Sequence, residues 1–186
     1  MRRLVLFTSA VIALACASAP EPAPVLDSRS PLERAADDAK VLVFYTIQSL
    51  DTAALRAQFA TSEGRLDHAR GMVNDARLSA VDAEKNAEAA ILQGDRIRDA
   101  VRGENGQPSR LSNYTRYWEL GRAKLDSARI ASLAAQVAAD SALVCSATSC
   151  TAVRARELRR LAQVAAGKAR EAESLVRIAI VYLAPR

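Results

Sequence analysis

The stretch that decides the fold is LDHARGMVNDARLSAVDAEKNAEAAILQGDRIRDAV, residues 66–101. Small or apolar residues recur along it at alternating steps of three and four, which is the spacing of a coiled-coil seam. The seam consists of Leu66, Ala69, Val73, Ala76, Ala80, Ala83, Ala87, Ala90, Gly94, Ile97 and Val101. The pattern predicts one long amphipathic helix, and its many small residues allow a partner helix to approach closely.

The same spacing returns further along the chain, between two clear breaks. The second seam is formed by Leu111, Tyr114, Trp118, Gly121, Leu125, Ala128, Ser132, Ala135 and Ala139. The segments GENGQPS (103–109) and CSATSC (145–150) interrupt the helical pattern, the first through its Asn-Gly and Pro. No stretch shows the alternation typical of a strand. Helices are therefore predicted at 110–144 and 150–183.

A third seam lies in the first third of the chain and starts at a well-marked helix N-terminus. Ser30, Pro31 and Glu33 fit a capping box with proline at the first helical position. The seam is formed by Leu32, Ala36, Ala39, Val43, Thr46, Leu50, Ala53, Ala57 and Ala60. It fails at the polar segment TSEG, residues 61–64, which predicts a turn between helices at 31–60 and 65–102.

Two alternatives to this turn stay open on the sequence. One long helix could cover 31–102, because a second seam would cross the turn unbroken through Leu55, Phe59, Ser62 and Leu66. A break near Asp51 is the other alternative. With the turn at 61–64, four helices of similar length favour an all-α fold: an up-down, coiled-coil-like four-helix bundle of long antiparallel amphipathic helices over residues 31–184.

The positions of the aromatic residues and of the charged residues along the chain both support this topology. An up-down bundle gathers most aromatic residues at the end where the first helix starts: Phe44, Tyr45, Tyr114, Tyr117, Trp118 and Tyr182. Residues 17–64 hold four basic and seven acidic residues, whereas 150–186 hold eight basic and three acidic ones. Because the first and last helices are neighbours in this topology, their opposite net charges attract.

The N-terminus carries export signals. Residues 1–15, with Arg2 and Arg3 followed by a mostly apolar run, read as a signal peptide too short to span a bilayer. The sequence Ala-Leu-Ala before Cys16 resembles the lipobox of bacterial lipoproteins, although the family prefers leucine one position earlier than Leu14. This resemblance implies cleavage before Cys16 and covalent lipid on its sulfur. Ordinary signal cleavage after Ala15 or Ala19 is the alternative.

Residues 16–30 are predicted to be an extended tether, because Pro20, Pro22 and Pro24 favour polyproline II geometry. By the lipoprotein sorting rule, Ala17 after the cysteine implies outer-membrane rather than inner-membrane retention. The protein is thus expected to be lipid-anchored in a bacterial cell envelope, on the periplasmic face of the outer membrane.

Net charge and the few cysteine and histidine residues limit which functions the chain can have. The chain has 186 residues and a formal net charge of +5, which falls to +3 without Arg2 and Arg3 and is too mild to imply nucleic acid. In an oxidising compartment Cys145 and Cys150 are expected to form a disulfide, which requires a loop between them because their side chains cannot meet on one helix. His68 is the only histidine. No metal site, catalytic set or cofactor is expected apart from lipid on Cys16, and the protein is not expected to be an enzyme.

Two candidate interaction sites remain. One is a basic patch near the start of the last helix, formed by Arg154, Arg156, Arg159 and Arg160, which could dock an anionic cell-wall component or an acidic envelope protein. The other is an aromatic pocket formed by Tyr114, Tyr117 and Trp118, although aromatic residues at seam spacing more often belong to a core.

The sequence therefore predicts a structural or adaptor protein of the cell envelope, acting through protein or cell-wall contacts. The main alternative is a periplasmic module that binds a small ligand, glycan or peptide at the aromatic end. A periplasmic chaperone that offers apolar stripes to unfolded clients is a third hypothesis. Self-association is compatible with each of them.

Overall fold

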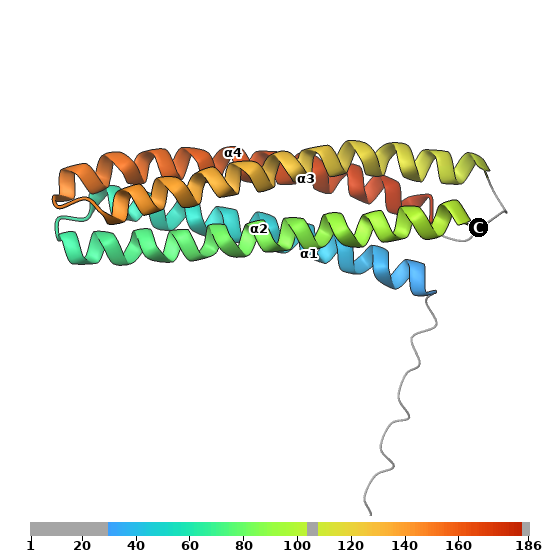
Figure 1. Cartoon of the computed structure of the whole chain (residues 1–186), viewed down its shortest axis with the longest axis horizontal. Helices are drawn as coiled ribbons and strands as arrows, with labels where there is room; N and C mark the ends of the chain where they lie inside the picture. The colour runs from blue at the N-terminus through green and yellow to red at the C-terminus, as the bar shows by residue number, and fades with distance from the viewer. Residues whose placement is uncertain (1–29, 104–107, 184–186) are drawn as a thin grey trace, which may run out of the picture.

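The computed structural model describes residues 30–103 and 108–183, and these form four antiparallel helices (Figure 1). The helices are α1 (Pro31–Ser62), α2 (Leu66–Gly103), α3 (Pro108–Leu143) and α4 (Thr148–Val181). Each observed boundary lies within two residues of the predicted one. Strands are absent from the described ranges, so the all-α four-helix prediction is confirmed. The predicted signal peptide, Cys16 and most of the tether lie outside the described residues.

Local chemistry fixes both ends of α1. The Oγ of Ser30 accepts a hydrogen bond from the backbone N–H of Glu33 at 3.2 Å, and the backbone N–H of Ser30 donates to Glu33 Oε2 at 2.7 Å. This is the predicted capping box, with Pro31 at the first helical position. At the other end α1 stops at Ser62 and α2 begins at Leu66, so 31–102 is two helices and the turn lies where the seam fails.

The helices pack in an up-down order. Helix α1 packs against α2 and α4, and α3 packs against the same two helices, so α1 and α3 are diagonal. The predicted attraction between the first and last helices includes an ion pair, in which Arg170 Nη2 lies 2.6 Å from Asp51 Oδ1. In Figure 1 the start of α1 and the end of α4 lie at one end of the bundle, and the α1–α2 and α3–α4 connections lie at the other.

All three seams face the core. Their members from Ala36 to Ala60, Ala69 to Val101 and Tyr114 to Ala139 are buried, and α4 contributes a fourth seam that the sequence analysis did not trace. That seam consists of Ala155, Leu158, Ala162, Ala165, Ala169, Ala172, Val176 and Ala179. The larger core residues, including Trp118 and Tyr114, lie toward the end where α1 starts, whereas the core near the α3–α4 connection is largely alanine.

The large apolar residues of α1 lie outside this core. Val41, Phe44, Tyr45, Leu55 and Phe59 are each between 46% and 50% exposed, although alanines of the same helix are buried. The part of the second seam formed by Leu55, Phe59 and Ser62 therefore lies on the outer surface of α1, and its next member, Leu66, belongs to α2. Phe44 and Tyr45, which the sequence groups with the aromatic residues of that end, do not join the core.

Candidate functional site

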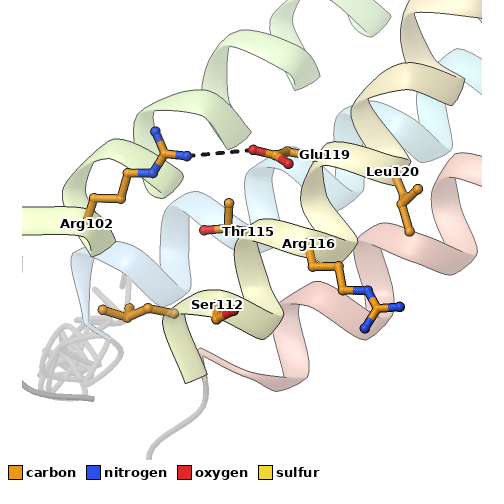
Figure 2. Close-up of a pocket in the computed structure, with 7 residues that line it drawn as sticks. Arg102, Ser112, Thr115, Arg116, Glu119 and Leu120 are labelled. Atoms are coloured by element: carbon orange, nitrogen blue, oxygen red, sulfur yellow. Dashed lines mark ion pairs between the residues drawn. The ribbon is translucent and has the colours of Figure 1, made fainter. Parts of the chain in front are cut away.

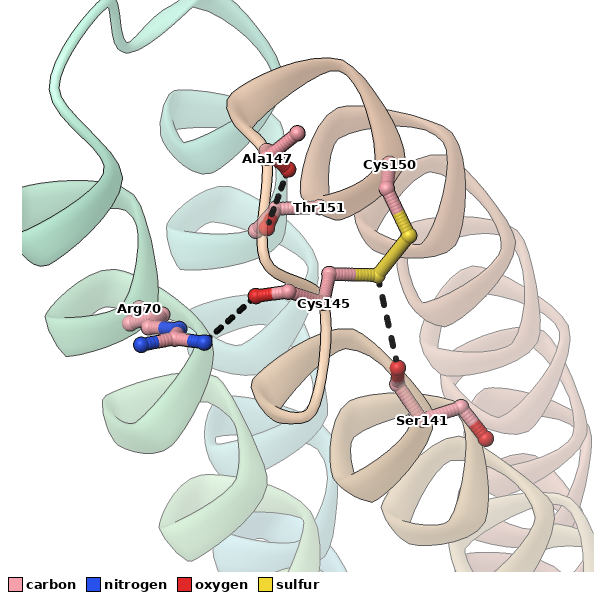
Figure 3. Close-up of a disulfide and its surroundings, with 6 residues drawn as sticks. All are labelled: Arg70, Ser141, Cys145, Ala147, Cys150 and Thr151. Atoms are coloured by element: carbon pink, nitrogen blue, oxygen red, sulfur yellow. Dashed lines mark hydrogen bonds between the residues drawn. A yellow bond between two sulfur atoms is a disulfide. The ribbon is translucent and has the colours of Figure 1, made fainter.

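The end of the bundle with the α3–α4 connection is closed by a disulfide between Cys145 and Cys150, as predicted (Figure 3). Their Cα atoms are 5.7 Å apart, because α3 ends at Leu143 and α4 starts at Thr148. Arg70 of α2 donates from Nη2 to the carbonyl oxygen of Cys145 and so ties the connection to a third helix. We call this end the disulfide tip.

The basic patch predicted at this tip is divided in the structure. Arg154 lines a shallow hollow beside the disulfide, together with Ser141, Val144, Cys145, Ser146 and Cys150. Arg156, Arg159 and Arg160 do not line that hollow, because with 3.6 residues per turn they project from the other side of α4 than Arg154. All four lie beyond the first turn of α4, which starts at Thr148, so the helix dipole opposes their charges less than their sequence position suggested.

One of these arginines is neutralised locally. Arg160 Nη2 lies 2.6 Å from Glu157 Oε1, and the hydrogen bond from Arg160 lowers the pKa of Glu157 below its ordinary value. Among the described residues, no ion pair involves Arg154, Arg156 or Arg159. The tip therefore offers three guanidinium groups without a carboxylate partner among the described residues, and one of them, Arg154, lies beside a hollow closed by the disulfide.

The aromatic residues at the other end do not form the predicted open pocket. Trp118 is 1% exposed and Tyr114 is 2% exposed, so both side chains belong to the core. Tyr117 is partly buried and stacks on Tyr182 of the C-terminal segment, with ring centroids 5.8 Å apart. The physical reason is Gly94 of α2, which has no side chain and leaves the space that the Trp118 indole fills.

A polar network that the sequence analysis missed holds Trp118 in place. Trp118 Nε1 donates to Asp95 Oδ1 at 3.0 Å, Arg122 Nε donates to Asp95 Oδ2 at 3.1 Å, and Arg98 Nη1 lies 3.0 Å from Oδ1. Burial by itself raises the pKa of Asp95, but these hydrogen bonds and positive charges outweigh it and hold the pKa below its ordinary value. The signal in the sequence was the tryptophan itself, since a buried indole N–H needs an acceptor.

A groove opens on the outer surface near this aromatic end, between the end of α2 and the first turns of α3 (Figure 2). Its lining residues are Arg102, Leu111, Ser112, Thr115, Arg116, Glu119 and Leu120. Arg102 lies 3.7 Å from Glu119, whereas Arg116 points away from that pair. The groove is broad and shallow, so it could hold a polyhydroxyl or anionic group only by a few surface contacts.

The described ranges contain no group of three or more histidine, cysteine or acidic side chains that could hold a metal ion. His68 is half-exposed, with Nε2 4.0 Å from Asp67 Oδ2. None of the helices α1 to α4 is both long enough and apolar enough to cross a membrane.

Comparison with known proteins assigns no relative: no family model matches the chain, and neither the curated proteins nor the solved structures contain a significant match.

Proposed function

We propose that the chain is an exported lipoprotein, anchored through lipid on Cys16 to the periplasmic face of the outer membrane, and that its bundle is an adaptor of the cell envelope. The anchor is supported by the lipobox-like sequence that ends at Cys16. Two or three acyl chains on one cysteine would hold the protein stably, whereas a single chain binds a membrane only marginally.

The observation that carries the adaptor role is the disulfide tip, where Arg154, Arg156 and Arg159 make no ion pair with a carboxylate of the described residues. The tip lies at the end of the bundle opposite the start of α1, and α1 alone is about 48 Å long at 1.5 Å per residue for its 32 residues. An N-terminal anchor would therefore present Arg154, Arg156 and Arg159 far from the membrane surface. Guanidinium groups of this kind favour anionic partners such as an acidic protein surface or a cell-wall polymer.

Intact mass tests the anchor. The protein purified from membranes should have the mass of residues 16–186 plus a diacylglyceryl or triacyl group. It should also be lighter by two hydrogen atoms before reduction than after it. An unmodified mass that starts between Ala17 and Pro20 would refute the lipoprotein proposal.

Capture of envelope components by the purified protein tests whether the disulfide tip binds a partner. Arg154→Ser, Arg156→Ser and Arg159→Ser together should abolish capture of the partner and leave helicity unchanged, because these side chains do not join the core. The matched control replaces three exposed basic residues outside both the tip and the groove, namely Arg34→Ser, Lys85→Ser and Arg96→Ser. Equal loss of capture in both triple variants would mean that overall charge, and not the tip, binds the partner.

The alternative function, a binding module at the aromatic end, is favoured by the groove that contains Arg116. Trp118 is too deeply buried to touch a ligand there, so a titration should follow an NMR or calorimetric signal. Binding of a cell-wall glycan that Arg116→Ala weakens tenfold would support this alternative over the adaptor role.

A further inference from the structure

The outer face of α1 carries a continuous seam that no part of the described chain covers. We define the outer stripe by its seven exposed positions, which again alternate steps of four and three: Val41, Tyr45, Gln48, Thr52, Leu55, Phe59 and Ser62. None of them is charged, and Phe44 lies beside Tyr45 on the same side. A heptad pattern without charge is the pattern by which one helix packs against another.

The composition of the outer stripe is unusual for a solvated surface. Its face holds Phe44, Tyr45 and Phe59, which are all the large exposed aromatic residues of the described chain. With Val41 and Leu55, these half-exposed side chains leave roughly 400 Å² of apolar surface open per copy. Patches of this size on a monomer are often functional. Two such faces together approach the roughly 1,000 Å² that a specific but reversible interface needs.

We propose that the outer stripe binds the outer stripe of a second copy of this chain, with the two α1 helices parallel and in register. The charges beside the stripe favour this partner and this direction. Asp51 and Arg56 lie on opposite borders of the stripe and are five residues apart. In a parallel, in-register pair, these are the border positions that meet across the interface, so Asp51 of each copy faces Arg56 of the other.

An antiparallel pair centred on the same stripe is disfavoured by these charges. In that arrangement the two copies of Asp51 meet near the two-fold axis, and like charges repel. Arg56 is exposed and makes no ion pair within the described part of its own chain, so it is available to a second copy. Asp51 is 51% exposed and already accepts from Arg170, and a carboxylate can accept from a second donor.

Parallel pairing has a further consequence for the N-termini. In a parallel pair both copies of α1 start at the same end of the dimer. Two anchors could then enter one membrane. This last point rests on the proposed lipid at Cys16, whereas the stripe and its charges do not.

Photo-crosslinking of the full-length protein tests the proposal. A benzoylphenylalanine replaces Phe59, and the protein is irradiated at about 100 μM, well above a micromolar dissociation constant. We expect a covalent dimer whose crosslink maps to tryptic peptide 57–65 of the second copy. The same photoreactive residue in place of Leu92, which is 53% exposed on α2, should give no dimer.

Substitutions distinguish the contribution of apolar packing to the dimer from the contribution of charge. Leu55→Arg should reduce the dimer yield at least fivefold, whereas Leu78→Arg, at a residue of α2 with the same half-exposure, should not change it. Arg56→Glu should also reduce the yield. Circular dichroism should show unchanged helicity in all three variants, because each altered side chain is half-exposed or more.

Several results would overturn the proposal. A crosslink to tryptic peptide 41–56 would mean antiparallel pairing, and a crosslink to residues 1–29 of the same chain would mean that the N-terminal segment covers the stripe. A crosslink only to another protein, or no crosslink, would exclude a second copy as the occupant. The mass measurement at Cys16 is independent of these results, so failure of the dimer and failure of the anchor are distinguishable.

Discussion

Replacement of Gly94 by alanine tests whether a single missing side chain makes room for the largest core residue. A Cβ at Gly94 would overlap the six-membered ring of Trp118, at Cη2, Cζ2 and Cζ3. The ring has no free direction to move, because Trp118 is 1% exposed and its Nε1 is hydrogen-bonded to Asp95. The carbonyl oxygen of Gly94 also accepts from the Tyr114 hydroxyl at 3.3 Å, which ties the same turn of α2 to α3.

The expected magnitude follows from opposing terms. Alanine in place of glycine inside a helix gains about 1 kcal/mol from helix propensity. Overpacking a well-filled core costs about 1–3 kcal/mol. Displacing the indole also breaks its hydrogen bond to the Asp95 carboxylate, which contributes about 1.5–3 kcal/mol. The losses exceed the gain, so Gly94→Ala should lower the free energy of unfolding by about 2–4 kcal/mol.

Urea unfolding followed by circular dichroism measures this change, and the fluorescence of the single tryptophan reports on the indole. The emission of Gly94→Ala should shift to longer wavelength, as expected for an indole pushed toward water. Gly71→Ala and Gly167→Ala are matched controls, because a Cβ at either position meets nothing within 4 Å. Both controls should raise stability by about 0.5–1 kcal/mol. A Gly94→Ala protein as stable as these controls would refute the steric account.

Three further predictions concern the disulfide, the buried carboxylate and the pair between α1 and α4. Reduction of Cys145–Cys150 should lower the free energy of urea unfolding by about 2 kcal/mol, and an unchanged midpoint would exclude a stabilising role. Since the pKa of Asp95 is lower in the folded state, its stabilisation is present above the ordinary value of 3.8 and is lost as the pH falls through the folded pKa. Asp95→Asn should therefore flatten the decline of stability below about pH 5. Arg170→Ala should cost less than about 1 kcal/mol, and that cost should vanish in 1 M salt, because both Arg170 and Asp51 are half-exposed.

Local signals in the sequence were sufficient for the helices and their ends. The capping box at Ser30 and Glu33 depends on side chains within one turn, so its hydrogen bonds need no tertiary contact. The turn after Ser62 was equally predictable from the sequence, because the seam fails at the polar segment 61–64. Seam spacing then predicted the buried side of α2 and α3, whereas α1 offered two seams.

The candidate sites were less predictable, because they depend on neighbours distant in the sequence. Nothing near Trp118 in the sequence shows that Gly94, on another helix, leaves a slot for its ring. The hollow that Arg154 lines likewise depends on where the disulfide turns the chain. These features are set by distance in space and not by spacing along the chain.

The sequence by itself determined four helices, their boundaries and the capped start of α1, because periodicity, caps and turns act within a few residues. Only the tertiary structure decided between the two seams of α1. Alanines such as Ala53 and Ala57 are buried in the core, whereas Leu55 and Phe59 are half-exposed. The physical reason is that small side chains let four helices approach closely along their whole length. The packing energy gained in this way arises only when the four helices are assembled, so the sequence of a single helix does not reveal it.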